Sequence, residues 1–166
     1  MEFFEVIRSR ASVRSFEKCD IPEEDLRSIV DAGRRAPSGL NRQPWEFIII
    51  EDEGTLQQLA RIQGCIAEAP AAVAVVVDES TTDWWREDSA AAVENMLLAA
   101  RSLGYHSLWV QGYVMRNEQF GKKVLNVPDD LRLVAILPVG KAAEEASQAS
   151  KKSLAEVVHY NTYGSS

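Results

Sequence analysis

Residues 35–50 read RAPSGLNRQPWEFIII, an irregular polar stretch that passes directly into an apolar, isoleucine-rich block. Its prolines, glycine and asparagine make residues 36–44 unsuited to a helix or to the interior of a sheet. Residues 45–51 are short, apolar and bounded by turn residues, which predicts a strand. The boundary between this loop and this strand therefore sets where the first strand of the fold begins.

The loop allows two interpretations. As a connector, it uses Pro37 to end the preceding helix and Pro44 to begin the strand. As a ligand-binding loop, it offers hydroxyl and amide groups from Ser38, Asn41 and Gln43, which suit the polar edge of a heteroaromatic ring. The residues of the loop alone leave both interpretations open.

Helical and strand patterns mix irregularly along the rest of the chain. The spacing of apolar residues predicts helices over residues 3–10, 20–35, 55–63, 86–103 and 117–125, with Asp20 capping the second. Apolar runs predict strands over residues 71–77, 107–111 and 131–139, the first of them buried on both faces. Because regular βαβ spacing is missing, we expect an α+β sandwich rather than a doubly wound sheet.

The composition narrows the possible partners. A chain of 166 residues with 46% hydrophobic residues is of a size for one domain. Its net charge of −7 argues against non-specific binding of nucleic acid, although a few local cations could still bind an anion. No apolar run approaches the roughly 20 residues of a membrane helix, and the start MEFFEVIRSR does not resemble a signal peptide. We therefore expect a cytoplasmic protein with no membrane partner.

The sequence shows no self-sufficient catalytic constellation. Cys19, Cys65, His106 and His159 are scattered, so we expect two reduced thiols and no metal site. The chain has no G-x-G-x-x-G, no phosphate-binding G-x-x-x-x-G-K-[ST], no G-x-S-x-G and no evident pair of catalytic carboxylates. An enzyme of this kind would depend on a bound cofactor, for which the protein supplies binding, orientation and electrostatics.

Two groups of cations could bind a phosphate. Arg10 and Arg14 lie near the N-terminus among several serines, and Lys151 and Lys152 lie near the C-terminus. Arginine forks with hydroxyl groups suit a phosphate monoester, although surface arginines at a solvated helix end are common. The last residues, 151–166, also hold late valines and tyrosines, which a partner subunit could cover.

Several segments together resemble the nitroreductase family of flavin-dependent oxidoreductases, in a short form. The pair RASVRSF at 10–16 and APSGLNRQPW at 36–45 is the most specific part of the resemblance. The remaining segments follow in the family's order: NMLLAA at 95–100 with LG at 103–104, SLWVQGY at 107–113, LNVP at 125–128, AILPVG at 135–140 and KKSLAEVVH at 151–159.

This resemblance implies an α+β sandwich with a central, mostly antiparallel sheet flanked by helices. It implies one FMN-binding domain over residues 1–166 in an intertwined homodimer, with residues 151–166 wrapping the partner subunit and FMN at the interface. The bound FMN would take hydride from NADH or NADPH and then reduce a nitroaromatic, quinone or similar small-molecule acceptor by a ping-pong mechanism. No catalytic side chain is implied, because the reaction takes place at the N5 atom of the flavin.

The resemblance also assigns residues by position. Arg10 and Ser12, with Ala11 between them, would hold the phosphate and ribityl chain, and Arg14 would reach the pyrimidine side. The loop residues Pro37, Ser38, Gly39 and Asn41 would line the flavin from the other subunit. Lys151, or Lys152 in a shifted register, would be the C-terminal phosphate ligand, and the backbone at Gln111 and Gly112 would approach N5.

The sequence departs from the family pattern in three places. Gly39 stands where a second serine is common, lysines replace the C-terminal arginine, and the flavin contacts expected between residues 59 and 68 have no clear counterpart, with Arg61 and Gln63 as candidates. The alternatives are a flavin-binding or flavin-handling protein without nitroreductase turnover, and a dimeric structural protein that has lost the cofactor.

Overall fold

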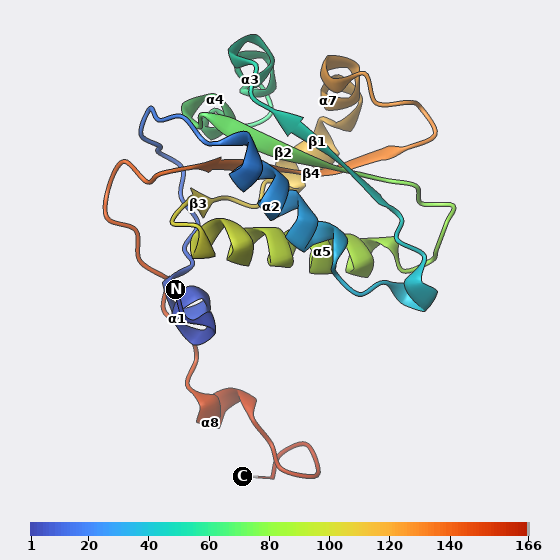
Figure 1. The fold of residues 1–166 in the computed structure, drawn as a ribbon. Coiled ribbons are helices and arrows are strands. Elements are labelled where there is room, and N and C mark those ends of the chain that lie inside the picture. The colour runs from blue at the N-terminus through green and yellow to red at the C-terminus, as the bar shows by residue number, and fades with distance from the viewer. Residues whose placement is uncertain (166) are drawn as a thin grey trace.

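A four-stranded antiparallel sheet in the order β1-β2-β4-β3 forms the centre of the computed structural model, which describes residues 1–165 (Figure 1). Residue 166, the last of the predicted tail, lies outside the described residues. The strands are β1 (Trp45–Ile50), β2 (Ala71–Val77), β3 (His106–Ser107) and β4 (Arg132–Gly140). The predicted antiparallel sheet is thus confirmed.

Strand β2 is the most buried element of the sheet. All seven of its residues are buried, and Val73 pairs with Ile49 on one side and with Leu137 on the other. Its odd-numbered residues at 71–75 pack into one hydrophobic cluster and its even-numbered residues into another, because side chains alternate across a strand. The prediction of a strand buried on both faces is therefore confirmed.

Helices cover the two faces of the sheet (Figure 1). The long helices α2 (Glu23–Arg34) and α5 (Trp85–Ser102) pack on one face. The other face is covered by four short helices, α3 (Glu53–Leu59), α4 (Cys65–Glu68), α6 (Gly112–Arg116) and α7 (Glu118–Leu125). This layering confirms the predicted α+β sandwich. Over residues 1–165, no helix combines the length and apolar character that crossing a membrane requires.

The second helix does not start where the sequence predicted. Asp20 is not its cap: α2 begins at Glu23, with Pro22 at the N-cap position and no side-chain cap bond. A residue that precedes a proline is disfavoured in helical conformation, so Ile21 cannot extend the helix backwards to Asp20. Three carboxylates in the first turn of α2 interact favourably with the helix dipole instead.

The predicted strand at 107–111 is mostly absent. Only His106 and Ser107 form β3, and Val110 makes one isolated bridge to Ile136. The position opposite Leu108 is Pro138, which has no N–H to donate, so the hydrogen-bond ladder is interrupted there. Helices α4 and α6 were not predicted, because neither is long enough to show a helical period.

The two ends of the chain lie away from the sheet. Helix α1 (Phe3–Ser9) sits near the C-terminal end of α5, and the last residues, with α8 (Leu154–Val157), run out beyond α1 (Figure 1). Residues 149–164 are exposed throughout, apolar side chains included; Leu154 is 78% exposed and Tyr163 is 94% exposed. This segment makes little contact with the rest of its own chain.

Glu118, the first residue of α7, ties that helix to strand β4. Its carboxylate accepts hydrogen bonds from Arg132 Nε at 2.8 Å, Arg132 Nη2 at 3.0 Å and the Leu133 N–H at 3.1 Å. Arg132 also pairs with Glu79, in the connection between β2 and α5. The hydrogen bonds from Arg132 lower the pKa of Glu118 below its ordinary value of 4.5.

We expect Glu118→Gln to lower the free energy of unfolding at pH 7 by about 1–3 kcal/mol, because it removes a charge-assisted pair. A lowered pKa means that the ionised form favours folding, so this contribution is present above pH 4.5 and is lost as the pH falls further. Thermal unfolding at pH 7 and about pH 3 measures the gap between the variant and the wild type. The exposed pair of Glu23 with Arg27 supplies the control Glu23→Gln. A gap for Glu118→Gln that does not narrow in acid would contradict this account.

Candidate functional site

The segment after α1 is extended and lies beside the end of the sheet. Ser12 forms a parallel bridge with Ser107, and the Val13 N–H donates to the Ser107 carbonyl at 3.1 Å. Ala11 and Val13 are buried, whereas Ser12 and Arg14 are exposed, as alternation along an extended chain requires. The polar side chains predicted to hold a cofactor therefore point away from the core.

The cations of this segment have no carboxylate partner. Across the part of the chain that the structure describes, no ion pair engages Arg10 or Arg14, although acidic residues outnumber basic ones. Gln148 holds the backbone here, since its Nε2 donates to the carbonyls of Ile7 at 3.0 Å and Arg10 at 3.2 Å. Two free guanidinium groups and the Ser12 hydroxyl are a suitable donor set for a phosphate.

Gln111 and Gly112 come shortly after β3, the edge strand to which Ser12 is bridged. Val110 exchanges two backbone hydrogen bonds with Ile136 of β4, at 3.1 and 2.9 Å, which fixes the chain just before them. Gln111 then takes the N-cap position of α6, and Gly112 is exposed as its first residue. Because Ser12 is paired with Ser107, the 10–14 segment lies alongside the strand region that leads to Gln111.

The loop at 37–43 is held in an unusual conformation. Leu40, Asn41 and Gln43 have positive φ values of 51°, 56° and 48°, a region that disfavours side chains with a Cβ, asparagine least. The Gln43 N–H donates to Ser38 Oγ at 2.9 Å, and the Gln43 side chain donates to the Asn41 carbonyl at 3.2 Å. Pro37 and Asn41 are exposed, so the Asn41 amide is free to meet a ligand.

The structure separates this loop from the N-terminal segment within one chain. Arg101 Nε, near the C-terminal end of α5, donates to Ser9 Oγ at 2.9 Å, whereas Asp88, near the N-terminal end, accepts from the Gly39 N–H at 2.9 Å. These two residues of α5 are thirteen positions apart, which at 1.5 Å per residue is about 20 Å. The two halves of the predicted site therefore lie at opposite ends of α5.

The C-terminal cations lie neither beside the 37–43 loop nor in the 10–14 segment. Lys151 and Lys152 are exposed in the segment that runs out beyond α1 (Figure 1), and no ion pair engages them in residues 1–165. Arg61, a candidate for the flavin contacts between residues 59 and 68, stacks its guanidinium on Phe120, 4.5 Å from the ring centroid. That contact gives Arg61 a structural role between the α3–α4 connection and α7.

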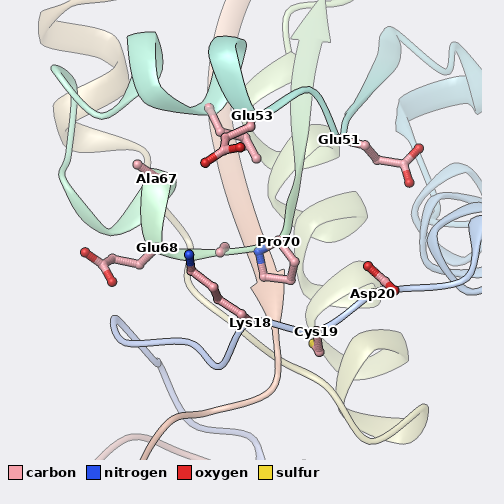
Figure 2. Close-up of a pocket in the computed structure, with 10 residues that line it drawn as sticks. Lys18, Cys19, Asp20, Glu51, Glu53, Ala67, Glu68 and Pro70 are labelled. Carbon is pink, nitrogen blue, oxygen red and sulfur yellow. The ribbon is translucent and has the colours of Figure 1, made fainter.

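The cavity shown in Figure 2 is separate from these residues. It has a volume of about 460 Å³ and contains none of the predicted site residues. Its charged lining is four carboxylates and one cation, from Lys18, Asp20, Glu51, Glu53 and Glu68. An excess of carboxylates opposes an anionic phosphate, so this cavity does not suit a nucleotide cofactor. In residues 1–165, no three His, Cys, Asp or Glu side chains are grouped to hold a metal ion.

Three buried polar atoms lack a hydrogen-bond partner in the described chain: Asp88 Oδ2, His106 Nδ1 and Trp109 Nε1. Buried polar atoms are normally paired, with protein groups or with ordered water. Burial lowers the pKa of His106, with a smaller effect from the nearby Arg101. Trp109 precedes Gln111 by two residues, and Asp88 contacts the 37–43 loop. The unpaired atoms thus lie beside the segments predicted to bind FMN, and the residues present are compatible with that cofactor.

Sequence reasoning missed Asp88 as a neighbour of the loop, whereas the doublet Trp84-Trp85 before the long helix was a candidate to overhang the flavin. The Asp88 carboxylate contacts a backbone 49 residues earlier in the chain, and only its place in the first turn of a predicted helix was visible in the sequence. Trp85 is buried in the core, whereas Trp84 is 51% exposed and lies against Gly39. The doublet of tryptophans was visible, but not which of the two faces the loop.

Comparison with known proteins identifies the family of this chain. The family model described as "Nitroreductase family" matches residues 7–81 and 58–141. An Archaeoglobus fulgidus protein described as "Putative NADH dehydrogenase/NAD(P)H nitroreductase" is 32% identical, with 87% of each chain covered. A crystal structure with the same description from Parabacteroides distasonis has a TM-score of 0.89 at 30% identity, covering 97% of this chain and 98% of the other.

A third relative contains a cofactor. The crystal structure of a "putative nitroreductase in complex with fmn" from Desulfovibrio desulfuricans has a TM-score of 0.86 at 28% identity, with 95% of each chain covered. The chain belongs to the nitroreductase family, which confirms the resemblance read from its sequence.

Proposed function

We propose that this protein is an FMN-dependent oxidoreductase that takes hydride from NADH or NADPH and reduces nitroaromatic, quinone or similar acceptors. The observation that carries the proposal is the set of unpaired cations and hydroxyls at residues 10–14, placed beside the segment leading to Gln111 and Gly112. A related structure of the same fold is described as a complex with FMN. When bound, FMN supplies the hydride acceptor and donor that the side chains lack.

The residues of the chain have binding and positioning roles in this proposal. Arg10 and Ser12 hold the phosphate, Lys151 or Lys152 adds a third charge, and Arg14 places positive charge near the pyrimidine, where it favours an electron-rich ring. The backbone at Gln111 and Gly112 approaches N5. The 37–43 loop presents Asn41 to the ring edge. None of these groups needs to exchange a proton with the substrate.

The proposal places each site between two subunits. The 37–43 loop and the 10–14 segment lie near opposite ends of α5, about 20 Å apart along the helix, and the proposed site combines them by taking each from a different copy of the chain. The surface near α1 supports such a homodimer, since Phe3 and Phe4 are 62% and 65% exposed. A cavity of about 450 Å³ opens beside them, lined by residues of α1, α2 and α5.

The C-terminal segment fits the same arrangement. Leu154, Val157 and Tyr163 are exposed although apolar or aromatic, and exposed apolar groups of this density mark interaction surfaces. We propose that residues 1–166 act as one FMN-binding domain whose tail, 151–166, covers the partner and carries Lys151 to the phosphate. The two unpaired cysteines and the use of NAD(P)H are consistent with a cytoplasmic location.

We also propose the ping-pong order that the family resemblance implies, in which NADH or NADPH would deliver hydride to the flavin first. Oxidised nicotinamide would then leave before the acceptor enters.

The experiment that tests the function is a visible absorption spectrum of the protein after dialysis with excess FMN. We expect a retained flavin band that bleaches when NADH or NADPH is added without oxygen and returns with menadione or a nitroaromatic. A retained flavin that neither nicotinamide reduces would indicate a flavin-handling protein instead. Loss of the flavin on dialysis would contradict the proposal.

Replacing the phosphate cations tests their assignment. We expect Arg10→Ala with Lys151→Ala to raise the Kd for FMN by about 100-fold or more, because each charge-assisted hydrogen bond contributes about 1.5–3 kcal/mol. Flavin fluorescence during titration measures this Kd. Lys141→Ala, an exposed lysine elsewhere on the surface, serves as the control. An FMN affinity equal to that of the wild type would refute the phosphate assignment.

Mixed dimers test whether the site is shared. The variants Arg10→Ala and Asn41→Asp, the latter chosen because aspartate tolerates positive φ, should each weaken both sites of a homodimer. A mixed dimer of the two variants should regain one intact site, since both changes fall in the other. Differently tagged subunits allow its purification, and titration counts the sites. Two weakened sites, one with the affinity of each single variant and neither intact, would place Arg10 and Asn41 in the same subunit's site.

A further inference from the structure

The strained loop at 37–43 needs an external support. Leu40 and Gln43 adopt positive φ without the tolerance that asparagine has, and such backbone persists only where its surroundings enforce it. Bonds inside the loop, such as Gln43 N–H to Ser38 Oγ, close the turn but do not attach it to the fold. The attachment comes from one turn of α5 and the residue before that helix.

Gly39 is held from two sides. Its N–H donates to Asp88 Oδ1 at 2.9 Å. The six-membered ring of the Trp84 indole lies against its Cα, so a Cβ at residue 39 would be 3.1 Å from Cζ3, 3.3 Å from Cδ2 and closer still to Cε3. Gly39 itself has no positive φ, so the contact with Trp84 and not backbone freedom requires a glycine. The departure from the family pattern at this position thus has a steric cause.

The two supporting residues are themselves coupled. The Asp88 N–H donates to the carbonyl of Trp84, the N-cap residue of α5, at 2.9 Å, so the two residues lie one helical turn apart. The backbone N–H of Trp84 donates to Thr82 Oγ1 at 3.2 Å, which holds the backbone of Trp84 in place. Asp88 is only 5% exposed, and its Oδ2 has no partner among residues 1–165. Water does not solvate this carboxylate as it would on the surface, so the bond from the Gly39 N–H to Oδ1 is its contact with the loop.

We propose that Trp84 and Asp88 form a clamp on Gly39 that holds the 37–43 loop in its left-handed conformation and so positions Asn41 for the cofactor. Both are positioning residues that act through Gly39 and the loop backbone. This inference rests on the proposed FMN site for its functional part. The clamp itself is a property of the loop, which can be measured without FMN.

The steric contact is tested with a pair of matched changes. Gly39→Ala inserts a Cβ into the indole, and Trp84→Ala removes the indole. We expect each to raise the Kd for FMN by about tenfold and to speed tryptic cleavage after the exposed Arg42. In the double variant the new Cβ has space, so its Kd should equal that of Trp84→Ala alone. Single effects that multiply in the double variant would overturn the proposed contact.

The hydrogen bond is tested at Asp88. Asp88→Ala removes the acceptor of the Gly39 N–H, whereas Asp88→Asn can keep an oxygen there. We expect Asp88→Ala to weaken FMN binding by about tenfold, shift the absorption band of the bound flavin and speed cleavage after Arg42, and Asp88→Asn to restore all three. Wild-type cleavage and affinity in Asp88→Ala would overturn the clamp.

A general loss of stability is separated by a control on the other face of the sheet. Lys122 is buried on α7 and donates to the carbonyls of Asp129 and Leu131, so Lys122→Met should lower the Tm without changing FMN affinity or Arg42 cleavage. Cleavage is measured without FMN. A wild type that binds no FMN would defeat the proposed function while cleavage still decides the clamp. If Lys122→Met speeds Arg42 cleavage as much as Asp88→Ala does, the clamp is overturned.

Discussion

Helix α5 is the constraint on which the candidate site depends. It contacts the start of the chain through Arg101 and the loop before β1 through Asp88. Its apolar face is buried against β2 and α2. A rigid helix between the two contacts keeps the two halves of the predicted site about 20 Å apart in every copy of the chain. The proposed homodimer would join them without bending a packed helix.

The charge distribution follows the same division. The chain as a whole is acidic, and its internal ion pairs use Arg27, Arg34, Arg35 and Arg132, which face carboxylates on their own or neighbouring elements. The cations of the proposed site have no such partner among the described residues. A guanidinium group without a carboxylate partner keeps its full attraction for an anionic ligand. In residues 10–14 two such guanidinium groups lie on either side of the exposed Ser12 hydroxyl, which is a donor set that suits a phosphate.

The sequence was sufficient where a signal was long or local. Strand β2 and helix α5 were predicted nearly to the residue. Seven consecutive apolar residues indicate a buried strand, and a helical spacing of apolar residues sustained along the 18 residues of α5 indicates a helix. It was insufficient where a distant residue decides. The break at Leu108 depends on Pro138 across the sheet, and Asp88 meets Gly39 only after folding. The resemblance predicted site residues, but their separation along α5 was not visible in the sequence, because it depends on the order of the elements in space.

Sharing a site between subunits couples cofactor binding to assembly. If FMN contacts both copies, it binds the dimer and not the separated chain, so the free ligand stabilises the dimer by mass action. Two contributions would then stabilise the dimer: burial of the apolar side chains of α1 and the tail, and the binding free energy of FMN. Each Asp88 clamp would serve the site whose phosphate cations belong to the other chain. A defect in the loop of one subunit would therefore appear as weak binding in the site that its neighbour anchors, and dilution of the protein would weaken binding further.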